Sequence, residues 1–157
     1  MKILKIISIT ILFLFVFIFG YTRLERITPL NFVDHNEINH GVFSDIAIHG
    51  FDPVSYHTEN KAVEGRSDIT LEWHGAVWQF ATEHNRSQFE ANPEKYAPMF
   101  GGYCAFAGSK GFTADTDPNV FEIIDGQLIL FAADDVRKEW MKDPETNLNT
   151  CHKNWED

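Results

Sequence analysis

Cysteine is the scarcest residue type in this chain of 157 residues, which contains only Cys104 and Cys151. The two cysteines do not form a C-x-x-C pair, so the sequence excludes a zinc knuckle and a thioredoxin-type redox motif. It also lacks a G-x-G-x-x-G loop, a Walker A loop and a Ser-His-Asp order, which argues against the phosphate-binding and hydrolase classes that use them. Any thiol chemistry therefore depends on these two residues.

Basic residues are few as well, with 13 Lys and Arg against 23 Asp and Glu. Residues 27–157 hold nine of the basic and 22 of the acidic residues, which gives this part a net charge of −13. Because nucleic-acid binding requires a basic face, the composition argues against a nucleic-acid partner. It also disfavours docking on anionic lipid.

The chain has no hydrophobic run of full membrane-spanning length. Its largely apolar run from Ile6 to Tyr21 has 16 residues, whereas about 20 span a bilayer comfortably. This length fits either a signal peptide or a short anchor, so residues 1–26 are interpreted as a signal or anchor segment. A cleavage site after Gly20 would place Ile18 at position −3, which is a poor fit, so the sequence favours an uncleaved anchor.

The charges that flank this run predict its orientation. Lys2 and Lys5 precede it, and the positive-inside rule keeps such an end in the cytoplasm. We therefore expect a domain outside the cytoplasm, anchored to the cytoplasmic membrane, or secreted to the periplasm if the signal is cleaved. The membrane is accordingly an expected partner through the N-terminal segment.

The remaining sequence predicts a linker over residues 27–44 and a single small α+β domain over residues 45–157. Period-two alternation on either side of turn residues predicts two β-hairpins, one around His74-Gly75 and one around Asp125-Gly126. Short helices should lie between and after them, because their capping and terminating residues are present. These predicted helices begin after Asp52 and Thr82, and further ones cover residues 133–143 and 144–157.

Three ordered motifs, "DPVSY", "VWQFATEHNRSQFEANPEKYAP" and "FGGYCAFAGSKGF", resemble the YHS domain. They are most similar to its single-domain secreted or membrane-anchored branch. The YHS resemblance covers about Asp52 to Pro98, and the branch pattern extends from about Ile46 to Trp155. The family implies metal binding, which is presumed to use paired cysteines. Here Ser55 and Ala81 occupy the two places where metal-binding members tend to have cysteine, so the resemblance implies no thiolate pair at those positions.

The resemblance directs attention to Cys104, because some members of the branch carry selenocysteine at this place. Selenium offers a low pKa and fast redox chemistry, so Cys104 is a candidate catalytic thiol and metal ligand. Gly101 and Gly102 permit positive φ angles and could aim backbone amides at the sulfur, which would lower its pKa. The alternative is an inert buried thiol, since free cysteine is among the most buried residue types.

Three further residues complete the candidate site. His49 and His57 flank the Asp-Pro turn and are candidate metal ligands or bases beside Cys104. Cys151 is a candidate disulfide partner or resolving thiol for Cys104. Three functions remain open at this point: binding of copper or another soft metal, thiol redox chemistry on peroxide or a partner protein's disulfide, and a non-catalytic membrane-tethered binding module.

Overall fold

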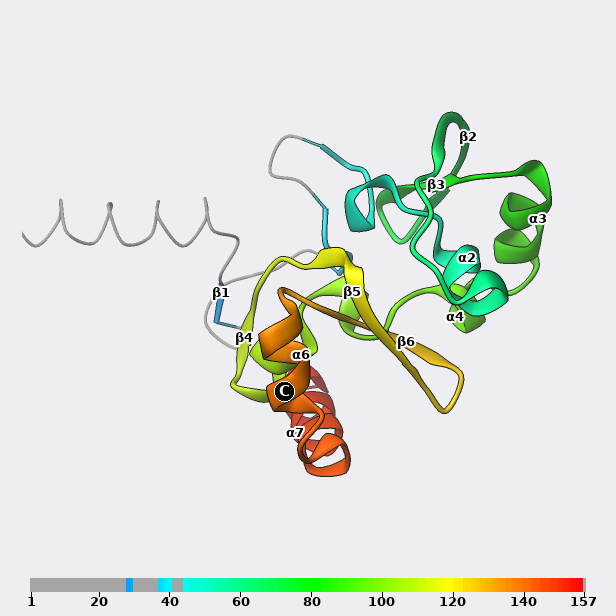
Figure 1. Cartoon of the computed structure of the whole chain (residues 1–157). Coiled ribbons are helices and arrows are strands. Elements are labelled where there is room, and N and C mark those ends of the chain that lie inside the picture. Colours follow the sequence, from blue (N-terminus) through cyan, green and yellow to red (C-terminus); the bar gives the residue numbers. More distant parts are fainter. Residues whose placement is uncertain (1–27, 30–36, 41–43, 157) are drawn as a thin grey trace, which may run out of the picture.

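A computed structural model describes residues 28–29, 37–40 and 44–156 of the chain (Figure 1). The apolar run of residues 6–21 lies outside these ranges, so its role as an anchor stays a prediction. Within them, no helix has both the length and the apolar character that crossing a membrane requires.

The described chain is an α+β fold of short elements, as the sequence predicts, with three separate two-stranded antiparallel sheets. In chain order, the elements are β1 (Thr28–Pro29), η1 (Ile48–Gly50), α2 (Pro53–Glu59), β2 (Arg66–Trp73), β3 (Ala76–Phe80), α3 (Glu83–Ala91), α4 (Pro93–Tyr96), η2 (Met99–Gly102), α5 (Ala105–Ser109), β4 (Phe112–Thr113), β5 (Asp117–Ile124), β6 (Gln127–Phe131), α6 (Asp134–Trp140) and α7 (Pro144–Glu156).

Both predicted hairpins are present, and their turn residues explain them. His74 and Gly75 have φ angles of 51° and 74° between β2 and β3, and Asp125 and Gly126 have 52° and 78° between β5 and β6. Two consecutive positive φ angles define the type I′ turn, whose twist matches that of the flanking strands.

The predicted helix caps also form. The Asp52 carboxylate accepts the Val54 N–H at 2.8 Å, with Pro53 opening α2. The Thr82 hydroxyl accepts the Asn85 N–H at 3.1 Å at the start of α3. Each cap satisfies an amide that has no partner within the helix.

The core consists of two clusters that share strand β6. We call them the amino-terminal cluster, which contains Trp78 and Phe89, and the carboxy-terminal cluster, which contains Cys104, Trp140 and Cys151. Successive side chains of a strand point to opposite faces. Accordingly, β6 gives its even-numbered Leu128 and Leu130 to the first cluster and its odd-numbered Ile129 and Phe131 to the second.

The described residues of the predicted linker contribute to this fold. Ile38 and Asn39 are 5% and 1% exposed, and the Asn39 N–H donates to the Gly101 carbonyl at 2.7 Å. β1 pairs with β4.

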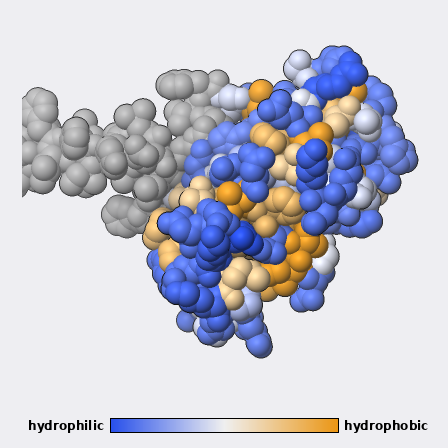
Figure 2. Space-filling model, in the orientation of Figure 1, coloured by the Kyte–Doolittle hydropathy of each residue, from blue (hydrophilic) through white to orange (hydrophobic). Residues whose placement is uncertain are grey.

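Figure 2 shows that hydrophilic residues cover much of the visible face, with hydrophobic residues gathered along the β5–β6 hairpin.

Candidate functional site

Cys104 lies inside the carboxy-terminal cluster at the start of α5, with 2% of its surface exposed. Its backbone is fixed on both sides: its N–H donates to the Ala114 carbonyl and its carbonyl accepts the Gly108 N–H, each at 3.0 Å. Its sulfur accepts the Ala132 N–H at 3.4 Å. The chain therefore holds this thiol in one place and gives its sulfur a hydrogen-bond donor.

Cys151, on α7, belongs to the same cluster and is fully buried. Gly108 accommodates it, because a Cβ atom on that glycine would lie 2.4 Å from the Cys151 sulfur. Since Gly108 is one helical turn after Cys104, the two cysteines meet the same short helix. Both are free thiols. Burial raises the pKa of the Cys151 thiol to about 12, and the charge of nearby Cys104 adds to this shift. The structure thus brings the two sulfurs into one buried region.

The glycines before Cys104 have a different role from the one the sequence suggests. Gly101 and Gly102 do have positive φ angles, of 59° and 80°. However, a Cβ on Gly101 would lie 1.9 Å from the Glu37 carbonyl oxygen, and one on Gly102 would lie 2.7 Å from the Ile48 side chain. These two glycines let residues 37–38 and η1 approach closely. The amide that bonds the Cys104 sulfur is that of Ala132.

His49 is held by a carboxylate. Its Nε2 lies 2.9 Å from Asp115 Oδ1, and the same oxygen accepts a hydrogen bond from the Asn39 amide at 2.9 Å. Asp115 directly follows Ala114, which bonds the backbone of Cys104. His49 is therefore connected to the Cys104 segment through the backbone rather than through the sulfur.

His57 lies in the helical layer beside the amino-terminal cluster. Its ring packs edge-on against Tyr96, with centroids 5.4 Å apart. Its Nε2 is buried without a hydrogen-bond partner among the described residues, and burial lowers the pKa of the imidazole. Across the described ranges, no three His, Cys, Asp or Glu side chains gather where they could hold a metal ion. Cys104, His49 and His57 therefore do not form one ligand set there.

The positions Ser55 and Ala81 do come together, around a buried carboxylate. Asp52 is 0% exposed, and it accepts the Ala81 N–H at 2.8 Å and the Asn85 side-chain amide at 2.7 Å in addition to capping α2. The same amide lies 3.4 Å from the Ser55 hydroxyl. Buried polar groups need such partners, so this network joins α2, the residue after β3 and α3 around one carboxylate.

Sequence reasoning missed the functions of Gly108, Ala132 and Asn85. A local signal existed only for Gly108, which follows Cys104 by four residues and so shares its side of a helix. Ala132 is 28 residues from Cys104, and Asn85 is 33 from Asp52. No sequence pattern connects residues at such separations.

Residues 54–99 match the sequence model of the YHS domain family. No curated protein and no solved structure matched the chain. The matched segment runs from α2 to the start of η2 and includes Ser55 and Ala81. It ends five residues before Cys104, so both cysteines lie outside it.

Proposed function

Because residues 54–99 form a YHS domain, we propose that this protein binds a soft monovalent metal ion such as copper(I) through the sulfurs of Cys104 and Cys151. We further propose that the N-terminal segment tethers it to the membrane with the domain outside the cytoplasm. The observation that carries the metal proposal is the burial of two free thiols in one cluster, with the Cys151 sulfur against Gly108, one turn after Cys104.

The donor set selects the kind of ion. Thiolate sulfur is a soft ligand that favours copper(I) over hard cations such as Mg²⁺ or Ca²⁺, which take oxygen ligands. Structural zinc sites use four protein ligands, and no three candidate ligands gather among the described residues. Two sulfurs suit an ion that accepts two ligands, so Cys104 and Cys151 fit copper(I) better than zinc.

The surrounding residues would support such an ion in two ways. The Ala132 N–H that bonds the Cys104 sulfur holds that sulfur in place. The apolar cluster excludes water but also raises the pKa of Cys151, so binding must displace a tightly held proton. Metal affinity should consequently increase with pH.

The test is an anaerobic copper(I) titration of the reduced protein against a competing chelator. We expect one equivalent to bind, and Cys104→Ser and Cys151→Ser each to weaken binding by roughly 100-fold or more. His57→Gln, outside the cysteine cluster, is the matched control and should bind as the unmodified protein does. Serine variants that both bind copper(I) as tightly as the unmodified protein would refute the proposal.

Thiol redox chemistry is the second candidate, and the burial of both free thiols in one cluster favours it, because a second thiol is available to resolve an oxidised first one. Peroxide would oxidise Cys104 to a sulfenic acid, and Cys151 would displace water to form a disulfide. Trapping with a sulfenic-acid reagent in Cys151→Ser, followed by peptide mass analysis, tests this route. A protein that neither binds copper(I) nor forms either product would be a non-catalytic tethered module.

A further inference from the structure

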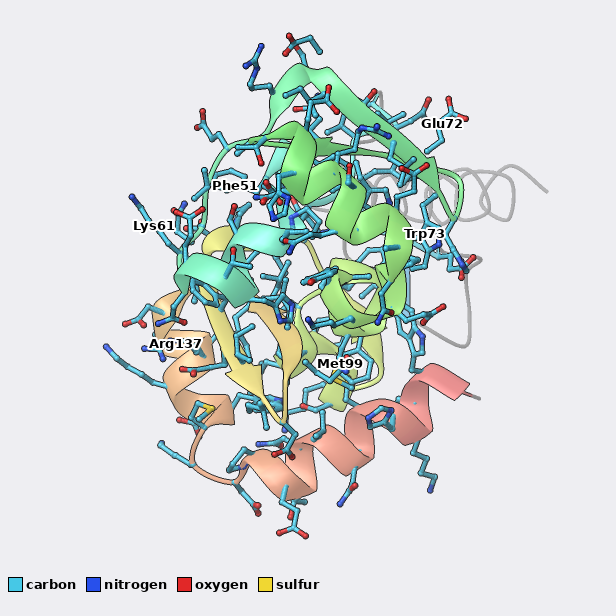
Figure 3. All side chains as sticks on the ribbon, turned by 90° about the vertical axis from the view of Figure 1, so that its right-hand side faces the viewer. Phe51, Lys61, Glu72, Trp73, Met99 and Arg137 are labelled. Atoms are coloured by element: carbon cyan, nitrogen blue, oxygen red, sulfur yellow. The ribbon has the colours of Figure 1, made fainter. Side chains whose placement is uncertain are left out.

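A cavity of about 220 Å³ lies away from the two sulfurs, where the β2–β3 turn, α4, η2 and the end of α7 meet. Its lining includes Glu37, Trp73, His74, Glu94, Met99 and Trp155. Figure 3 shows Trp73 and Met99, with Glu72 near Trp73 at the end of the β2–β3 hairpin. Drug-sized ligands occupy pockets of about 300–1,000 Å³, so this cavity suits a small headgroup.

The charge of the lining is negative. Glu37 and Glu94 contribute carboxylates, and neither Lys nor Arg is among the residues that line the cavity. His74 pairs with Glu37. Glu94 has no ion-pair partner within the described ranges, because its neighbour Lys95 bonds the Tyr96 hydroxyl at 3.1 Å and lies over that ring instead. One carboxylate is thus left to attract a cation.

The aromatic lining is held rigidly. Trp73 packs against Trp78 and Phe89, with ring centroids 5.8 and 5.6 Å apart. Trp155 packs against Phe100 at 6.0 Å. Tryptophan faces attract cations through the ring quadrupole, and they do so most strongly among the aromatic side chains. Two fixed indoles and an unpaired carboxylate around one small cavity are complementary to an organic cation.

We infer that this cavity binds an alkylammonium group, the positive end of a small amine or quaternary ammonium compound. A metal ion is a poorer fit, because Glu37 is paired with His74 and the Glu94 carboxylate alone falls far short of the six or more oxygen ligands that hard cations take. An anion would be repelled by the carboxylates. The inference does not depend on the proposed metal function, since neither cysteine lines the cavity.

The test compares the binding of choline with that of its neutral carbon isostere 3,3-dimethyl-1-butanol. Binding to the full chain is measured by calorimetry and by tryptophan fluorescence. Phosphate buffer is used because it contains no competing amine. We expect saturable choline binding and much weaker binding of the isostere. Equal binding of the two, or no saturable choline binding, would overturn the inference. A parallel titration uses lysine with blocked amino and carboxyl termini. If this lysine binds more tightly than choline, the ammonium group comes from a lysine side chain of a protein or peptide.

Two pairs of variants locate the binding. Glu94→Gln should weaken choline binding by about fivefold, whereas Glu59→Gln, an equal charge change at the exposed end of α2, should change it less than twofold. Trp155→Phe should retain more affinity than Trp155→Leu, since phenylalanine keeps a ring face. Equal effects of the two glutamate variants would show general charge attraction and refute a site in this cavity.

Discussion

At the scale of single residues, the same side chain type acquires different properties from its surroundings. Cys104 has a backbone N–H on its sulfur, while burial raises the pKa of Cys151 to about 12. Asp52 caps a helix and also accepts hydrogen bonds from Ala81, just after β3, and from Asn85 in α3. Residue identity suggested a thiol site, but the surroundings of each sulfur determine what it contacts and, for Cys151, how readily it ionises.

Cys151 should react very slowly with alkylating agents in the folded protein. A thiol with a pKa of about 12 is about 0.01% thiolate at pH 8, against roughly a quarter for an ordinary thiol with a pKa of about 8.5. In the unmodified protein, iodoacetamide labelling of the Cys151 peptide at pH 8 should therefore be about a thousandfold slower than in the urea-denatured chain. Mass spectrometry over time measures both rates.

The denatured chain is itself the control for this measurement, because it contains the same thiol without the fold. Native labelling within tenfold of the denatured rate would show that Cys151 is accessible and ionised. Cys151 would then not be buried in the folded protein as the candidate site requires.

At the scale of elements, the contact between α5 and α7 positions the two sulfurs. α5 is only five residues long, so its stability must come from tertiary packing rather than from helix propensity. The absence of a side chain at Gly108 lets the Cys151 sulfur approach the helix closely. The carboxy-terminal helix is therefore part of the candidate site and cannot be removed without dismantling it.

Replacing Gly108 with alanine should destabilise the protein, although the same change in an exposed helix stabilises it by about 1 kcal/mol. The added Cβ would lie 2.4 Å from the Cys151 sulfur, and such overpacking costs about 1–3 kcal/mol. Urea denaturation followed by tryptophan fluorescence measures the free energy of unfolding.

A double-mutant cycle gives the control. Cys151→Ala removes the sulfur that the new methyl group would meet, so Gly108→Ala should cost much less in that background. If the two substitutions are additive, the close approach of α7 to Gly108 is not what the alanine disturbs.

At the scale of the whole molecule, the acidic charge bears on solubility and the N-terminal run on the proposed location, and neither specifies a reaction. A net charge of −13 over residues 27–157 favours solubility and opposes association with nucleic acid. The negative cavity beside Trp73 is consistent with this overall charge. The pairing of β1 with β4 ties the segment that follows residue 26 to the folded domain.

A phosphatase fused after Asp157 should be active, since Lys2 and Lys5 precede the apolar run and predict an exported domain. The enzyme should be one that folds only outside the cytoplasm, and protease added to spheroplasts should digest the domain. A fusion that starts at residue 27 is the control and should be inactive. An inactive full-length fusion with a protected domain would contradict this topology.

Local signals in the sequence determined the elements of this protein. The hairpins follow from His74-Gly75 and Asp125-Gly126 with alternating residues on either side, and the helix starts follow from Asp52 and Thr82. These features depend on neighbours a few residues apart, so backbone geometry alone makes them predictable. The α+β class followed from their order.

Only the tertiary structure decided how the candidate site is assembled. The meeting of Cys104 with Cys151, the placement of His57 beside Tyr96 and the division of β6 between two clusters all join segments that are distant in sequence. Such contacts depend on how whole elements pack, and packing responds to shape and volume across the entire core rather than to any local motif. The sequence therefore determined that two thiols were available, and the fold decided that both lie in one buried cluster.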